Sequence, residues 1–281
     1  MGADLWSKTS PNGSWSQVTN GFSRNLQVAG SRVAFIDGAG TLKAIDLKVG
    51  VWTEQFKGSF DDYVITPNLV LVRVGATLLG KANLTDTWST LTTGIPPNFT
   101  VSGNRIAYLT GNTLMTKDGV NGAWKNQTSG FDSYAITSSL IVVQMGARLD
   151  AKKNPDDTWS PRIATDFSRD LQVAGSRIAY VNSAGTLRAS EGLGSGFTDQ
   201  ITGFDDYYLS DSMLIVRVGT NLYGKAALTD AWSLLTPGAP PNTRLDGQWV
   251  TFIDSSGLMA KLGVNGSWFP LLPQFDTYVI G

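Results

Sequence analysis

Short apolar segments that alternate with polar residues recur along the whole chain. Residues 31–37 alternate in this way, and residues 77–83 and 88–92 are short apolar segments bounded by turn-forming residues. Asn-Gly pairs, with many further Gly and Pro residues, separate the segments. No window has the 3.6-residue periodicity of an amphipathic helix. The pattern therefore predicts β-strands joined by tight hairpin turns.

The pattern repeats about every 36 residues. The repeat is marked by Trp15, Trp52, Trp88, Trp124, Trp159, Phe197, Trp232 and Trp268, spaced by 37, 36, 36, 35, 38, 35 and 36 residues. The sequence of residues 28–44 recurs with few changes at residues 173–189, and that of residues 71–88 recurs at residues 215–232. These close matches lie 144 or 145 residues apart, which is four repeats, so a four-repeat block has been duplicated.

Each repeat predicts four strands, illustrated by residues 61–66, 69–74, 77–82 and 88–92. Four short antiparallel strands repeated in a closed array are typical of a β-propeller. We therefore expect an all-β propeller of about eight four-stranded blades, formed by residues 1–281 as a single domain. An open solenoid would need polar capping repeats, and the sequence has none.

The two ends of the chain indicate how the eighth blade could form. Residues 1–15 align with residues 74–88, so the chain begins in the middle of a repeat, and residues 268–281 form the first part of another repeat. Together the two end segments would form one further repeat that lacks only a counterpart of residues 66–73. We expect both termini to share one closing blade, with a seven-bladed propeller as the alternative.

The recurring order V-x-G-x-R-I-A, G-T-L and W, seen at residues 102–124 and 173–188, resembles a family of bacterial, mainly actinobacterial, tandem-repeat proteins. In organisation the chain is similar to the tachylectin and tectonin lectin propellers. That resemblance implies sugar binding at one pocket per blade or between blades. No sugar-contacting position is carried over, because the sequence lacks their Trp-rich loop.

Composition excludes several classes of function. The chain contains no Cys and no His, which removes disulfides, thiolate nucleophiles, histidine metal sites and Ser-His or Cys-His catalysis. The net charge of −1 is spread without basic runs, so we expect no nucleic-acid partner. No apolar stretch predicts a membrane span or a signal peptide. No cofactor or metal is expected. Secreted and cytosolic locations both fit, with the former slightly favoured.

Two repeated positions are interpreted as structural. The Trp of each repeat is expected to fill the wedge between blades. A basic residue seven positions earlier is interpreted as a strand lysine whose stem covers apolar neighbours. It is found at Lys8, Lys81, Lys117, Lys152, Lys225 and Lys261, with Ile45 and Ser190 in its place in two repeats.

A third repeated pattern, Phe-Asp-x-Tyr, gives the candidate binding residues. It occurs at residues 60–63, 131–134, 204–207 and 275–278. The loop before the first strand of a blade and the loop after its second strand lie on the same face, and the second loop also carries one polar residue in each repeat. The predicted ligand-binding set is Asp61, Asp62, Tyr63, Arg73, Asp132, Tyr134, Gln144, Asp205, Asp206, Tyr207, Arg217, Asp276 and Tyr278. The alternative is that the Phe residues are core and the Asp residues cap turns.

Three functions are compatible with these residues. The leading hypothesis is a multivalent, non-enzymatic lectin for mono- or oligosaccharides, since equivalent polar groups recur and linked weak sites gain avidity. A protein-interaction scaffold is the second hypothesis. A carboxylate-dependent glycosidase or lyase using Asp61 and Asp205 is the third, but equivalent positions argue against divided acid and base roles.

Overall fold

The structure of the chain is a computed structural model that describes residues 4–8, 13–272 and 278–279. Within these ranges it is an all-β propeller fold with seven four-stranded sheets, called blades 1 to 7 here, and one two-stranded sheet. By its contacts the chain divides into an N-terminal unit, residues 1–129 with 279–281, and a C-terminal unit, residues 130–278. No helix long and apolar enough to cross a membrane occurs in the described ranges.

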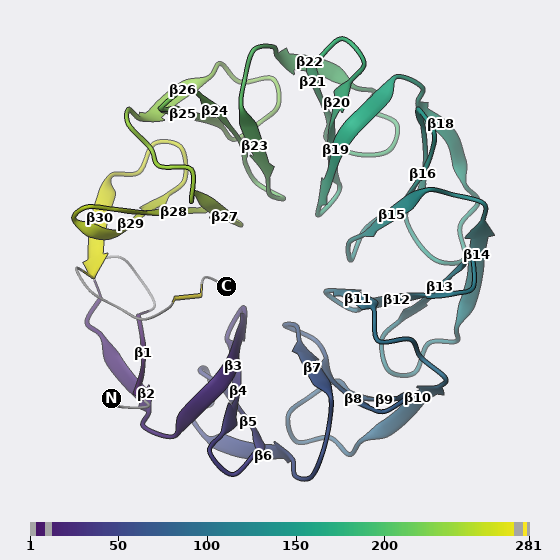
Figure 1. Cartoon of the computed structure of the whole chain (residues 1–281), viewed down its shortest axis with the longest axis vertical. Helices are drawn as coiled ribbons and strands as arrows, with labels where there is room; N and C mark the ends of the chain where they lie inside the picture. Colours follow the sequence, from purple (N-terminus) through teal and green to yellow (C-terminus); the bar gives the residue numbers. More distant parts are fainter. Residues whose placement is uncertain (1–3, 9–12, 273–277, 280–281) are drawn as a thin grey trace. The chain divides into compact units, whose positions relative to one another are not determined.

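The N-terminal unit contains the two-stranded sheet and blades 1 to 3 (Figure 1). The two-stranded sheet is formed by β1 (Leu5–Ser7) and β2 (Ser16–Thr19). Blade 1 contains β3 (Phe22–Ala29), β4 (Arg32–Asp37), β5 (Leu42–Asp46) and β6 (Trp52–Phe56). Blade 2 contains β7 (Asp62–Ile65), β8 (Val70–Val74), β9 (Thr77–Lys81) and β10 (Ser89–Thr93). Blade 3 contains β11 (Phe99–Ser102), β12 (Arg105–Thr110), β13 (Thr113–Asp118) and β14 (Lys125–Ser129).

The C-terminal unit contains blades 4 to 7. Blade 4 contains β15 (Ser133–Ile136), β16 (Ile141–Met145), β17 (Arg148–Lys152) and β18 (Ser160–Ala164). Blade 5 contains β19 (Phe167–Ala174), β20 (Arg177–Asn182), β21 (Leu187–Ser190) and β22 (Thr198–Ile201). Blade 6 contains β23 (Asp206–Leu209), β24 (Leu214–Val218), β25 (Asn221–Lys225) and β26 (Ser233–Thr236). Blade 7 contains β27 (Arg244–Asp246), β28 (Trp249–Asp254), β29 (Gly257–Leu262) and β30 (Trp268–Leu272).

Every blade is an antiparallel meander in which consecutive strands pair. In blade 2, Asp62 pairs with Arg73 across β7 and β8, and Val70 pairs with Lys81 across β8 and β9. The second strands are buried on both faces, and Val70 and Val72 have no exposed surface. The four strands predicted for each repeat are confirmed in all seven blades.

The expected eighth four-stranded blade is not found, and this prediction is corrected to seven. Among the described residues β1 and β2 pair only with each other, and residues 278–279 belong to no strand. Residues 273–277 lie outside the described ranges.

Nevertheless, β1 and β2 take the place of the last two strands of a blade relative to blade 1. The indole nitrogen of Trp52 donates a hydrogen bond to the carbonyl of Val18 in β2, at 2.9 Å. Trp88 in blade 2 donates in the same way to Gln55 in β6, at 2.9 Å. The predicted alignment of residues 1–15 with 74–88 is therefore consistent with the packing of the N-terminal unit.

Apolar clusters between neighbouring blades show the same duplication as the sequence. In the N-terminal unit Ala34, Leu42 and Val72 pack with Tyr63 between blades 1 and 2. In the C-terminal unit the equivalent residues pack between blades 5 and 6, and they are Ala179, Leu187, Val216 and Tyr207. Burial of these surfaces stabilises the contact of each blade with the next.

The repeated aromatic residue lies at the boundary between blades, as predicted, but it is half-buried. Trp124 donates to Leu91 at 2.8 Å, and Trp268 donates to Leu235 at 2.8 Å, in each case to the preceding blade. The flat ring packs on its neighbours while its N–H satisfies a backbone carbonyl. The tryptophans are therefore structural contacts between blades.

The repeated lysine completes this contact. The ammonium of Lys81 lies 4.9 Å from the ring centre of Trp88, and that of Lys225 lies 4.6 Å from Trp232. Lys81 Nζ also donates to the carbonyl of Leu84 at 2.8 Å. Burial lowers the pKa of Lys81, an effect that the charge of Asp86 partly offsets. The structural interpretation of this lysine is confirmed.

Candidate functional site

In blades 2, 4 and 6 the first Asp of the Phe-Asp-x-Tyr copy closes a turn between the second and third strands of the blade. The Asp61 carboxylate accepts the backbone N–H of Gly75 at 2.6 Å. In blades 4 and 6 the same bond joins Asp132 to Gly146 at 2.5 Å and Asp205 to Gly219 at 2.6 Å. These glycines have φ values of 58°, 59° and 59°, a left-handed conformation that favours Gly. We call the three assemblies the acidic turns of blades 2, 4 and 6.

A polar residue on the second strand completes each acidic turn. Arg73 Nη1 lies 3.2 Å from the Asp61 carboxylate and 3.0 Å from the carbonyl of Gly75. In blade 6 the Arg217 guanidinium pairs with Asp206, and this hydrogen bond raises the pKa of Arg217. The expected proximity of the Asp and Arg residues is therefore found in both units.

In blade 4 neutral residues take the places of the second Asp and of the Arg. Gln144 occupies the arginine position and donates to the carbonyl of Gly146 at 3.1 Å. Ser133 takes the place of the second Asp, and its hydroxyl donates to Gln144 Oε1 at 2.7 Å. The three turns thus share the bond from the first Asp to the glycine N–H, and the turn of blade 4 lacks the Asp-Arg ion pair of the other two.

The tyrosines of the motif do not face solvent in blades 2 and 6, which corrects the expectation of an exposed aromatic surface there. Tyr63 is 0% exposed and Tyr207 is 4% exposed. Burial, with the charge of Asp62, raises the pKa of Tyr63. The strand alternation explains this placement, since β7 points Asp62 outward and Tyr63 into the contact with blade 1.

The remaining predicted residues lie as follows. Tyr134 is half-buried and its ring centre lies 6.1 Å from that of Phe131. Tyr278 is half-buried, with the Arg244 guanidinium 4.9 Å from its ring centre. Asp276 lies outside the described residues. The exposed part of the predicted set is therefore Asp61, Asp62, Asp132, Asp205 and Asp206.

Two unrepeated acids bear on the enzyme hypothesis. Asp150 is buried, and it accepts Arg148 Nε at 2.7 Å and the Arg162 backbone N–H at 2.7 Å. The Arg148 hydrogen bond holds the pKa of Asp150 below its ordinary value, despite partial burial. A carboxyl group whose pKa is lowered in this way is a poor candidate for a general acid.

The second unrepeated acid, Asp166, lies in a polar cluster of blade 5. It accepts the Tyr180 hydroxyl at 2.7 Å and Arg188 Nη1 at 3.0 Å. Burial alone would raise the pKa of Asp166, but the Tyr180 hydrogen bond and the Arg188 charge together hold it below its ordinary value. Among the described residues no group of three or more acidic side chains is placed to hold a metal ion.

Blade 5 also contains a feature that the sequence analysis missed. A cavity of about 210 Å³ lies where Ser190 and Phe197 replace the usual lysine and tryptophan. Its other walls include Ile163 of blade 4, Ile178 and Leu193. A second, outer cavity of about 430 Å³ shares the walls formed by Leu193 and Gly194. The signal was present in the sequence as the only repeat in which both positions are substituted.

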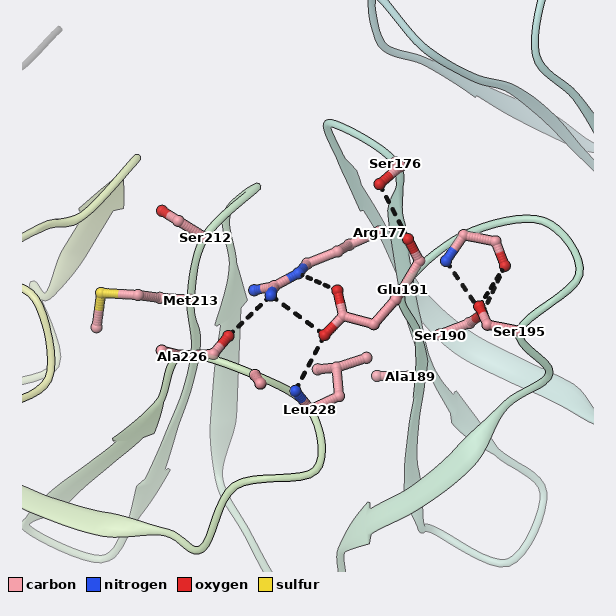
Figure 2. Close-up of polar contacts among 12 residues, drawn as sticks. Ser176, Arg177, Ala189, Ser190, Glu191, Ser195, Ser212, Met213, Ala226 and Leu228 are labelled. Carbon is pink, nitrogen blue, oxygen red and sulfur yellow. Dashed lines mark hydrogen bonds and ion pairs between the residues drawn. The ribbon is translucent and has the colours of Figure 1, made fainter.

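The loop that borders this cavity, residues 191–196, is tied to the strands around it. Figure 2 shows Glu191 bonded to Arg177 of β20, with Arg177 Nε to Glu191 Oε2 at 2.7 Å. Glu191 also accepts the backbone N–H of Leu228 at 3.0 Å, and Arg177 donates to the carbonyl of Ala226 at 2.8 Å. The pair therefore joins blade 5 to blade 6 and holds the start of the loop in place.

Comparison with known proteins supports the fold class. No family model and no curated protein matches the chain. The computationally designed protein Ika8 is 12% identical with a TM-score of 0.53, over 90% of this chain and 87% of that one. PorZ of Porphyromonas gingivalis has a TM-score of 0.45 at 12% identity, over 95% of this chain and 42% of that one. Hsv2p of Kluyveromyces lactis has a TM-score of 0.44 at 10% identity, over 79% of this chain and 86% of that one. The likeness to Ika8 concerns the fold alone, and it agrees with a β-propeller.

Proposed function

We propose that the protein is a non-enzymatic, multivalent glycan-binding propeller whose sites are the acidic turns of blades 2 and 6. The observation that carries the proposal is the exposed second Asp opposite an arginine, which recurs in these two blades. A binder with several equivalent sites requires such repetition, whereas catalysis requires one asymmetric arrangement.

The second Asp of the turn is the main ligand group in this proposal. Asp61 is occupied by the turn that it closes, while the exposed Asp62 carboxylate accepts the N–H of its neighbour Tyr63 at 2.8 Å and has further acceptor capacity. A sugar hydroxyl can donate to a carboxylate and accept from a nearby guanidinium. Asp62 with Arg73, and Asp206 with Arg217, provide this combination.

Each such site would be shallow and weak, because the motif tyrosines of blades 2 and 6 are buried and offer no stacking surface. Several linked weak sites can still bind a surface that presents many glycans, through effective concentration. The proposal therefore predicts avidity for immobilised glycans and low affinity for the free sugar.

The test is a glycan array with the wild-type protein and the double variant D62N/D206N. Both changes remove charge and keep the size of the side chain, and neither removes the Asp that closes the turn. The exposed Glu54 belongs to blade 1, where it pairs with Lys43 at 2.6 Å, and it provides the control variant E54Q. We expect the double variant to lose array binding and E54Q to keep it. Equal binding by all three proteins, or no glycan bound by the wild type, would reject the proposal.

A further inference from the structure

The cavity of blade 5 is lined by Ser190 and Phe197, which stand at the positions of the repeated lysine and tryptophan. In blade 6 the same space holds Lys225, whose ammonium donates to the Leu228 carbonyl at 2.7 Å and lies over Trp232. In blade 4 it holds Lys152, which donates to the Pro155 carbonyl at 2.8 Å and lies 5.0 Å from the ring centre of Trp159. The neighbouring blades thus show which chemistry this part of the fold accommodates.

Blade 5 keeps the surroundings of this group but not the group itself. Ser190 stands seven residues before Phe197, at the lysine position, and Leu193 stands at the position of Leu228. The loop makes the same turn, since the Ser195 N–H donates to the Gly192 carbonyl at 3.3 Å as the Asp230 N–H does to Ala227 at 3.1 Å. Serine supplies no charge, and both replacements are smaller than the residues they replace.

Blade 1 shows that loss of the lysine does not by itself require a cavity. There the lysine position is Ile45, which is 5% exposed and fills the space beside Trp52. In blade 5 the 3%-exposed Ser190 instead bonds to the loop, donating to the Gly192 carbonyl at 2.9 Å and lying 3.1 Å from the Ser195 hydroxyl. The Ser190 side chain is therefore bonded to the loop and does not fill the space that Ile45 fills in blade 1.

The outer cavity favours a negative group at the other end of a ligand. It is lined by the exposed Lys153, by Lys152 and by the hydroxyl residues Thr158 and Ser160. Lys152 already donates to backbone carbonyls, and Asp157, also in the wall, accepts the Asn154 N–H at 2.9 Å. A carboxylate at this end would meet the Lys153 ammonium and hydroxyl donors.

From these observations we infer that the blade 5 cavity binds a short ω-amino carboxylic acid. Its ammonium takes the place of the lysine ammonium of the other blades, against the ring of Phe197, and its alkyl chain packs on Ile163, Ile178 and Leu193. Its carboxylate lies in the outer cavity beside Lys153. This site is separate from the acidic turns and does not depend on their function.

The test uses 5-aminopentanoate as the probe, observed by ligand NMR and calorimetry at neutral pH. Pentanoate lacks the ammonium, and n-butylammonium lacks the carboxylate. We expect 5-aminopentanoate to bind, n-butylammonium to bind several-fold more weakly, and pentanoate to give no saturable binding. Equal binding of pentanoate and 5-aminopentanoate, or no binding of 5-aminopentanoate, would overturn the inference without any mutation.

Two variants taken from the chain's own repeats locate the site. S190I introduces the residue of blade 1 and S190K that of the other blades, and each should raise the dissociation constant at least about tenfold by filling the cavity. Thermal melting checks that each variant is folded. If S190I does not fold, S190K alone provides the test. The D62N/D206N variant should bind 5-aminopentanoate as the wild type does. Unchanged binding by folded S190I or S190K would contradict the assignment.

Discussion

The hydroxyl of Tyr63 donates a hydrogen bond to the backbone carbonyl of Ala34, 3.0 Å away in the preceding blade. It also contacts the carbonyl of Asn25, whose φ of 55° marks an irregularity in β3. Tyr207 makes the same contacts with Ala179, at 3.1 Å, and with Asp170. The tyrosine of the repeated motif is therefore a link between blades, while the acids before it form the surface turn.

Removal of this hydroxyl should destabilise the protein without changing its surface. Y63F removes the hydroxyl that donates to the buried Ala34 carbonyl, so we expect a loss of about 1–3 kcal/mol in the free energy of unfolding. Chemical denaturation measures the loss, with Y207F as the equivalent change in the C-terminal unit. A Y63F protein of full stability that had lost glycan binding would show instead that the tyrosine contacts ligand.

Substitution of Asp61 should lower the stability of the protein more than substitution of Asp62. D61A removes the acceptor of the Gly75 N–H and should cost about 1 kcal/mol of stability. D62A leaves that bond intact and should change stability by less than about 0.5 kcal/mol, as is usual for surface positions. Denaturation curves of both variants test the difference. A larger loss for D62A than for D61A would reverse the roles assigned to them.

The indole hydrogen bond between blades should be measurable in isolation. W88F keeps an aromatic ring, as blade 5 does with Phe197, but loses the bond to Gln55. We expect a loss of about 1–3 kcal/mol, and a greater loss for W88A of about 3 kcal/mol or more. Melting curves report both values. If W88A melted with the wild type, Trp88 would have no structural role in the contact between blades.

The Asp150 ion pair should make part of the stability depend on pH. The pKa of Asp150 is lowered in the folded protein, below its ordinary value of 3.8. Its contribution is therefore present at neutral pH and is lost as pH falls through the folded-state pKa. D150N should be less stable than the wild type at pH 7, and the difference should shrink below about pH 4. A difference that is constant from pH 7 to pH 3 would contradict this account.

The repeat pattern was enough to predict the fold class, because strand alternation and turn residues are local properties. It predicted the four strands of blade 2 and the structural role of Lys81 for the same reason, but not the contact of the Lys81 ammonium with the Trp88 ring. The number of four-stranded blades was expected to be about eight. Among the described residues β1 and β2 pair only with each other, and strand pairing is not a local property that the repeat pattern encodes.

The candidate site was predicted in part. Asp61 and Arg73 were expected on one face and are paired, because strand register brings the ends of β7 and β8 together. Tyr63 was expected beside them, but strand alternation turns it inward. The cavity at Ser190 was missed because it arises from two substitutions whose effect appears only when the missing volumes are compared between blades.

The number of glycan sites per chain tests the central claim most directly. Titration calorimetry of the wild-type protein with the best array glycan should give more than one equivalent site per chain, and D206N alone should lower that number without changing the affinity of the remaining sites. A single site in the wild type, or a stoichiometry that D206N leaves unchanged, would contradict the account.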